Sequence, residues 1–473
     1  MSFLRLIYCS MLKRNNLLLG IILFINSSCF AQMKPVVGLK IAIDSALQNY
    51  PTLQSKQMQI ESAHASLSDA SDLELPSLTF SDQVDIGTDN GLGGSYFPMS
   101  IIPSTSGGIR SGNNSNIFSG TIGVAYLQHE LYNFGLNGAR TESANSLIDF
   151  STSDYDQSSY LLQFHVAQLY FELLRYRLLV AIQQRNIDRY QVLYGFIKAY
   201  TSSGIKPSVD SSIARAEIST ANIQYIQTAE TFNKLKSEFL YFTGLRINDF
   251  DIDTTLYHLP DISINRLEQN ISRDSIDAGN PVLAYYNNRW KYALSQENVT
   301  AKSYLPKIYL VGSAWIRGSS ISQSDVFGNF STGLDYSRSN YMAGLALTYN
   351  IIDLVHKSDR TAIQHYQSES MREDVLQQQS LLKNQLQQAD IAIQSAIDRQ
   401  KEIPIQLKAA QDAFSQKSAQ YDAGLANITD LTDATYLLYK AETDEAELLP
   451  NLLNALLQKS AANNTLNIFL ANF

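Results

Sequence analysis

The sequence predicts a mostly α-helical chain with two β-hairpins, built as a tandem two-fold repeat. Three observations support this fold class. Segments of the first half recur in order in the second half, apolar residues keep a heptad spacing over very long stretches, and two regions alternate polar and apolar residues as strands do. With 473 residues, 45% of them hydrophobic and 17% charged, the chain is long enough for two or three ordinary domains or for one large repeated architecture.

Residues 1–31 are predicted to be a secretory signal peptide. Lys13 and Arg14 precede the apolar run LLLGIILFI, and a small-residue cleavage site follows it at Ala31. A membrane anchor is the weaker interpretation because this run is much shorter than a membrane-spanning helix. Lipidation of Cys29 stays open as an alternative, although INSSC is a poor acylation sequence.

Loss of this segment would change both the charge and the redox chemistry of the chain. Both cysteines, Cys9 and Cys29, lie within it, so the exported chain would form no disulfide and would depend on packing or assembly for its stability. Three basic residues would also be lost, which makes the mature chain more acidic than the formal charge of −9 of the full sequence. This acidity argues against a nucleic-acid partner. The mature sequence also lacks an apolar run long enough for a transmembrane helix.

The repeat divides the mature chain into residues 32–260 and 261–473. Pro51 aligns with Pro281 and Pro76 with Pro306 at one offset, and a second offset joins the later segments of the two copies. The change of offset falls in a Gly/Ser/Asn-rich segment of the first copy, so the copies differ mainly in loop length. The predicted elements are, in the first repeat, helices 40–74 and 136–243 with a β-hairpin at 78–133, and, in the second repeat, helices 281–304 and 354–470 with a β-hairpin at 307–352.

Each hairpin consists of two alternating segments joined by a loop. The clearest segment covers 340–352, where Tyr341, Leu345 and Leu347 share one face with other apolar residues. Segments of about ten residues with one apolar face are typical of membrane-spanning barrel strands. Asp82 departs from this pattern in the first hairpin.

The helical segments carry heptad registers that predict helix-on-helix packing. One register runs from Leu162 to Ile197 and is broken only by Gln183. A second runs from Ala389 to Phe414. Helices of this length extend far beyond a globular core.

Two short segments, 200–209 and 421–429, are predicted turns at which a long helix reverses into a returning one. Gly204 and Gly424 supply the permissive backbone.

Acidic residues follow both predicted turns. Asp210 and Asp430 lie near the start of the returning helices, where a carboxylate is favoured by free N–H groups and the helix dipole. Asp433 has no such explanation, and its counterpart in the first copy is Ile213. Two acids three positions apart on one helical face repel each other unless they are well solvated or share a cation.

The four strands of one chain are too few to close into a barrel, and open strand edges are excluded in lipid. Closure therefore needs several chains. Three copies would give twelve strands, enough for a trimeric 12-stranded β-barrel, together with a tube of packed helices.

The doubled Asn-Pro (with Tyr50 inserted in the first copy), the doubled Leu-Pro and the stretch YDAGLANITDLTDATYLLYKAETDEAELL resemble the TolC-like outer-membrane efflux proteins. The resemblance covers nearly the whole mature chain. It implies a homotrimeric channel-tunnel in the outer membrane of a Gram-negative bacterium, in contact with outer-membrane lipid and extending into the periplasm. It also implies a passive conduit for a tripartite efflux or type I secretion system, docked by a periplasmic adaptor (membrane fusion) protein and an inner-membrane RND, ABC or MFS transporter.

The resemblance also assigns roles to residues at the predicted turns. Asp430 and Asp433 match the family's D-x-x-D and would form a cation-selectivity ring at the periplasmic entrance. Tyr421 and Asp210 would make contacts that hold the helical coils closed. The family's best-described member has an arginine where Ala426 stands here, so either Lys206 supplies that charge or the closed state is less tightly held.

No catalytic, metal or cofactor site is predicted. The six histidines lack metal-binding spacing, the Gly-rich stretch GTDNGLGGSY lies between strands as a surface loop, and no G-x-S-x-G sequence occurs. An alternative function is a non-conducting periplasmic structural or adhesive coiled-coil protein, which would need neither the alternating strands nor the acidic pair. The exported substrate, whether drug, metal or protein, is not specified by the sequence.

Overall fold

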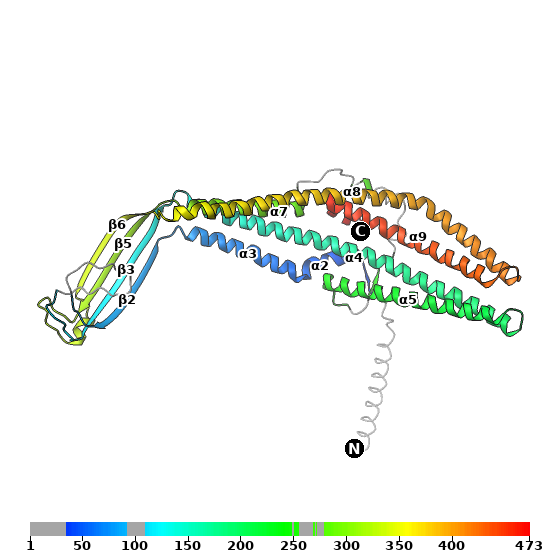
Figure 1. The fold of residues 1–473 in the computed structure, drawn as a ribbon, viewed down its shortest axis with the longest axis horizontal. Coiled ribbons are helices and arrows are strands. Elements are labelled where there is room, and N and C mark those ends of the chain that lie inside the picture. Colours follow the sequence, from blue (N-terminus) through cyan, green and yellow to red (C-terminus); the bar gives the residue numbers. More distant parts are fainter. Residues whose placement is uncertain (1–34, 92–108, 248–249, 255–267, 270, 272–278) are drawn as a thin grey trace, which may run out of the picture. The chain divides into compact units, whose positions relative to one another are not determined.

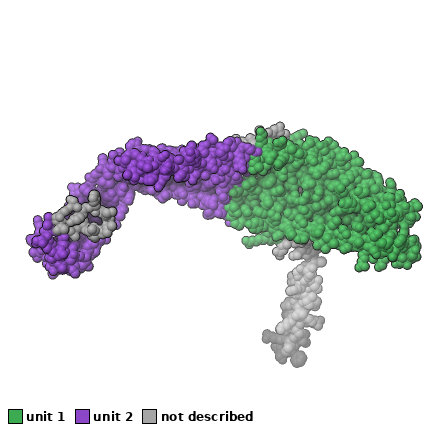
Figure 2. Space-filling model, viewed as in Figure 1, with its two compact units in different colours: residues 1–53, 158–280, 381–473 green, residues 54–157, 281–380 purple. Residues whose placement is uncertain are grey.

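The computed structural model describes residues 35–91, 109–247, 250–254, 268–269, 271 and 279–473. The predicted signal peptide with Cys9 and Cys29, much of the first hairpin loop and the predicted repeat boundary at 260/261 lie outside these ranges. The chain forms two compact units (Figure 2). We call residues 54–157 and 281–380 the sheet unit, and residues 1–53, 158–280 and 381–473 the tip unit.

The sheet unit contains a four-stranded antiparallel sheet in the order β2-β3-β5-β6 (Figure 1). Each repeat supplies one hairpin, and the two hairpins join through β3 and β5. Within the described ranges, the outer edges of β2 and β6 have no strand partner. The strands are β2 (Ser77–Gly87), β3 (Phe118–Tyr132), β5 (Lys307–Ser319) and β6 (Arg338–Thr348).

The strand register gives the sheet one apolar and one mainly polar face, because residues paired across strands point to the same side. One row runs through Phe80, Ala125, Ala314 and Tyr341, and the next row, on the opposite face, begins at Ser81. The apolar face carries large exposed side chains: Leu78, Phe80, Val84, Ile86, Ile316, Tyr341, Leu345 and Leu347. Asp82 also lies on this face, so the irregularity in the sequence pattern is a real feature of the sheet.

Four helical segments pack side by side in the sheet unit. Lys56 of α3 forms an ion pair with Asp154 of α4, and Phe150 of α4 stacks on Tyr292 of α7 with ring centroids 6.0 Å apart. Ser368 of α8 donates a hydrogen bond of 2.8 Å to Glu297 of α7. The helices are α3 (Pro51–Asp72), α7 (Pro281–Ser303), and the portions within this unit of α4 (Leu136–Ser202) and α8 (Asp353–Asp422).

The tip unit holds the rest of α4 and α8, the two returning helices and a small parallel bridge. Its deepest side chains include Tyr170, Phe171, Phe239 and Phe469, which form an aromatic cluster. The remaining elements are α2 (Leu39–Asn49), α5 (Ser208–Thr243), α9 (Ile428–Ala462), α10 (Leu466–Leu470), and β1 (Val36–Val37) paired in parallel with β4 (Asp251–Ile252). None of the described helices is both long and apolar enough to span a bilayer.

Three predicted helical ranges are interrupted, and in 136–243 the break is the predicted turn between α4 and α5. Residues 40–74 form two helices instead of one, since Tyr50 adopts an extended conformation (φ −72°, ψ 116°), as residues before a proline usually do. The range 354–470 is interrupted at the predicted turn and again after α9, where Asn464 has a φ of 61°. In contrast, α8 continues through Pro404.

Candidate functional site at the helical tips

The tip unit contains two helix–turn–helix tips of the same geometry. Gly204 and Gly424 have φ values of 72° and 75°. The N–H of Ile205 donates to the carbonyl of Tyr200 at 2.9 Å, and the N–H of Leu425 donates to that of Gln420 at 2.8 Å. These six-to-one bonds around a left-handed residue are the Schellman ending of a helix. Glycine is favoured at such a position because it lacks a Cβ.

The two returning helices start differently. The Asn427 side chain caps α9 by accepting a hydrogen bond of 2.8 Å from the N–H of Asp430. Pro207 precedes α5 and offers no side-chain cap, so the N–H of Asp210 donates to the Pro207 carbonyl at 3.1 Å. Both acids lie in the first turn of their helices, where the helix dipole favours negative charge.

The structure brings Tyr421, Asp210 and Lys206 together. Tyr421 is fully buried at the end of α8, and its hydroxyl donates to Oδ2 of Asp210 on α5 at 3.2 Å. The Nζ atom of Lys206 lies 4.5 Å from the centroid of the tyrosine ring, within cation–π range. Burial and the charge of Asp210 raise the pKa of Tyr421 to about 12, so the hydroxyl stays protonated and can donate. These contacts connect one helical hairpin to the other.

Apolar packing supports this connection. Tyr421 belongs to a buried cluster with Ile197, Ala214, Ile428 and Leu431, which come from all four helices of the two tips. Ala426 is among the partly buried residues that pack against this cluster. Position 426, where the resemblance led us to look for a positive charge, is therefore an apolar contact in this chain.

Asp430 and Asp433 lie in the first two turns of α9. Oδ2 of Asp430 lies 3.4 Å from Nζ of Lys417 on α8, and both side chains are 40% exposed. Asp433 is exposed. Tyr190 on α4 has its pKa raised to about 12, mainly by burial and to a smaller extent by nearby charges that include Asp433. The acidic pair thus has two environments, one beside a lysine and one near α4. Neither the ion pair of Lys417 nor the cap by Asn427 was predicted from the sequence.

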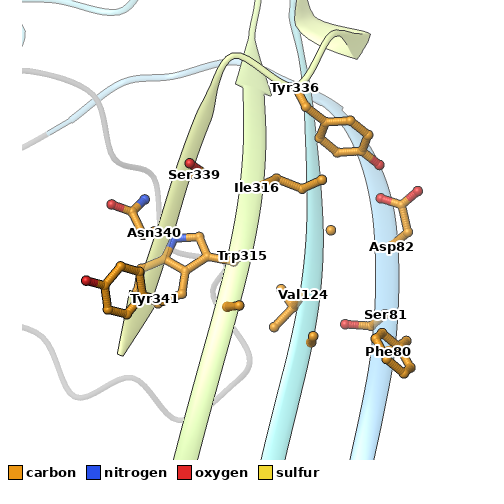
Figure 3. Close-up of a pocket in the computed structure, with 13 residues that line it drawn as sticks. Phe80, Ser81, Asp82, Val124, Trp315, Ile316, Tyr336, Ser339, Asn340 and Tyr341 are labelled. Carbon is orange, nitrogen blue, oxygen red and sulfur yellow. The ribbon is translucent and has the colours of Figure 1, made fainter. Parts of the chain in front are cut away.

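Described residues of the sheet unit line a surface hollow. Its lining residues include Phe80 and Tyr341 on one face and Ser81 and Trp315 on the other (Figure 3). Because both faces contribute, we regard it as the open side of a sheet and not as a ligand pocket. Among the described residues, no cluster of His, Cys, Asp or Glu is arranged to hold a metal ion.

A sheet with an apolar face, joined to very long helices that reverse at glycine turns, defines the class of outer-membrane channels built from hairpins and helices. A family model described as outer membrane efflux protein matches residues 42–232 and 274–462. The chain therefore belongs to the outer membrane efflux protein family. The two matched segments also correspond to the two repeats seen in the sequence.

Comparison with solved structures gives the same fold. The outer membrane protein VceC from Vibrio cholerae matches with a TM-score of 0.70 at 14% identity, covering 90% of this chain and 95% of that chain. The CmeC outer membrane channel of Campylobacter jejuni matches with a TM-score of 0.71 at 13% identity, covering 90% and 86%. The open state of the MtrE outer membrane channel of Neisseria gonorrhoeae matches with a TM-score of 0.66 at 16% identity, covering 90% and 89%. No curated protein sequence matches the chain.

These findings confirm the family, the fold class and the outer-membrane location with its periplasmic extension that the sequence predicted. The chain is an outer-membrane efflux channel component. Members of this family are trimeric channels that work with adaptors and inner-membrane transporters.

Proposed function

We propose that three copies of this chain form one passive conduit, with their sheets closed into a 12-stranded barrel and their helices into a periplasmic tunnel. The observation that carries this proposal is the sheet itself. Its two edge strands have no partner among the described residues, and its apolar face is exposed. Unpaired edges in lipid are strongly unfavourable, and pairing β6 of one copy with β2 of the next removes them.

The conduit acts without chemistry of its own, between an inner-membrane transporter of the RND, ABC or MFS type and the cell exterior, with a periplasmic adaptor holding the two together. Substrate choice then belongs to the transporter and adaptor. The alternative of a non-conducting periplasmic coiled-coil protein does not fit the family to which the chain belongs. The exposed apolar face of the sheet favours the conduit, since a soluble coiled coil would gain nothing from it.

The helical tips form the periplasmic entrance in this proposal. Asp430 and Asp433 from each copy make a ring of carboxylates that attracts cations and repels anions. The contacts of Tyr421 with Asp210 and Lys206 hold the two hairpins of one copy together in the closed state. The positions of these residues support both proposed roles, because the two acids and the tyrosine contacts lie at the tips and the tyrosine contacts link the two hairpins.

The test is single-channel conductance of the detergent-purified oligomer in planar bilayers. Wild type is compared with Asp430→Asn/Asp433→Asn, and Asp444→Asn further along α9 is the matched control for loss of an acid. We expect a cation-selective conductance that trivalent lanthanum blocks, with both properties lost only in the double variant. An assembled oligomer that forms no channel would refute the proposed conduit. A double variant that behaves like wild type would refute the ring while leaving the conduit intact.

A further inference from the structure

We infer that Lys417 sets the cation selectivity of the periplasmic entrance by offsetting the charge of Asp430; this inference rests on the proposed acidic ring. Lys417 lies in the last turns of α8, and Asp430 lies in the first turn of α9, so the ion pair spans the second tip. The two side chains approach to 3.4 Å. Lys417 is the only cation whose ion pair with either acid is recorded within the described ranges.

The backbone holds Asp430 in reach of this lysine. Asn427 caps α9 through the N–H of Asp430, which fixes the first turn of the helix relative to the turn at Gly424. The Schellman ending fixes the other side, where α8 stops. The two capped helix ends therefore bring the Lys417 side chain within reach of Asp430.

Comparison of the two repeats indicates that this lysine is special to the second tip. With Gly204 aligned on Gly424, Lys417 corresponds to Ile197 and Asp433 corresponds to Ile213. Ile197 is completely buried, and Ile213 packs against the same cluster. The second tip therefore has a lysine and an added aspartate at two positions where the first tip has isoleucines. Because Lys417 and Asp433 both occur only in the second tip, we infer that they act together to set the net charge of that tip.

The charge of Lys417 changes the net charge of the ring substantially but contributes little to the stability of the fold. Each copy contributes the two carboxylates of Asp430 and Asp433 and the one ammonium group of Lys417 to the proposed ring, so in a trimer these lysines offset half of the ring's negative charge. The ring then keeps a moderate field for cations instead of binding them tightly, which a conduit requires because ions must leave as well as enter. Ion pairs at this exposure contribute little to folding, so removal of the lysine should leave assembly intact.

The experiment measures the cation-to-anion permeability ratio and the lanthanum block of purified trimers in planar bilayers. Lys417→Gln should raise the permeability ratio at least about two-fold at ionic strengths near 0.1 M, where charges within about 10 Å act on the permeating ion, and should strengthen the block. Lys417→Arg should behave like wild type. Lys408→Gln is the matched control, because Lys408 also lies on α8 and pairs with an acid, Asp412, at 3.0 Å.

The outcomes separate this inference from the proposed function. If Asp430→Asn/Asp433→Asn reduces selectivity but Lys417→Gln equals Lys408→Gln, the inference is wrong and the acidic ring stands. If the double variant has no effect either, the ring itself is refuted. Lys417→Met, which retains the aliphatic stem, provides a second test should the glutamine variant assemble poorly, and an unchanged ratio in that assembled variant would overturn the inference.

Discussion

Substitution of Tyr421 by phenylalanine tests the closed-state contact most directly. The change removes one hydroxyl group and leaves the ring in its apolar cluster and beside Lys206. The hydroxyl makes the only hydrogen bond to the Asp210 carboxylate recorded among the described residues. Asp210 is 9% exposed, so water can replace the lost donor only in part.

The size of the effect follows from the type of bond. A hydrogen bond to a charged group contributes about 1.5–3 kcal/mol, and an unsatisfied buried acceptor adds a penalty. Every 1.4 kcal/mol corresponds to about a tenfold change in an equilibrium. If the bond exists only in the closed state, Tyr421→Phe should raise the open-to-closed ratio at least about tenfold for each copy.

The assay is the open probability of single channels, together with cellular leakage of a bulky antibiotic that the closed channel excludes. Tyr439→Phe is the control, because it removes an equivalent hydroxyl from α9, where Gln183 donates to Tyr439 at 2.6 Å away from the tip turn. Asp210→Asn keeps a neutral acceptor and should have an intermediate effect. Open probabilities of Tyr421→Phe and Tyr439→Phe that both equal that of wild type would refute the latch.

Three further predictions concern pH, backbone strain and the sheet. The pKa of Tyr421 is raised to about 12, so the hydrogen bond from its hydroxyl stabilises the closed tip fully below the ordinary tyrosine pKa near 10 and is lost as pH rises towards 12. Between pH 10 and 12, open probability should therefore rise in wild type and stay constant in Tyr421→Phe. Gly204→Ala should destabilise the tip by about 1–2 kcal/mol through its φ of 72°, whereas Gly195→Ala inside α4 should be neutral or stabilising, as measured by heat dissociation of the oligomer. Phe80→Arg on the apolar face of β2 should cost about 2–4 kcal/mol per copy and lower the yield of assembled channel, whereas its neighbour Ser81→Arg should assemble normally; equal yields would contradict the facial assignment.

Sequence pattern was most informative where the structure repeats a simple period. The alternation that assigned Tyr341 and Leu345 to one face follows directly from the two-residue repeat of a strand, and the register of β6 agrees with it. The break at Tyr50 was missed because the apolar pattern continues on both sides of it. The following Pro51 was the available signal, since proline disfavours helix in the residue before it. The β1–β4 bridge was also missed, because two-residue strands are too short to show any period.

Contacts between residues far apart in the sequence were harder to predict. Tyr421 and Asp210 are 211 positions apart, and only the family resemblance suggested that they act together. Lys417 and Asp430 are 13 positions apart, but the intervening turn reverses the chain, so helix periodicity does not relate them. Comparison of the two repeats could have identified Lys417, because a lysine at a position that is a buried isoleucine in the other copy must occupy a different environment.

The two tips have the same backbone geometry but carry different charged residues, and this difference suggests that the two copies have separate roles at the entrance. Both turns end in the same Schellman geometry around a glycine, so the turn itself imposes no asymmetry. The first tip carries Lys206 against the Tyr421 ring, while the second has Ala426 at the matching position and places its lysine beside Asp430 instead. The contact that links the hairpins therefore depends on a cation from the first tip, and the charge of the proposed ring depends on residues of the second.

This division of roles predicts opposite effects for the two lysines. Lys206→Gln should change open probability without changing cation selectivity, and Lys417→Gln should change cation selectivity without changing open probability. Variants that altered both properties together would show that latch and ring are one electrostatic unit.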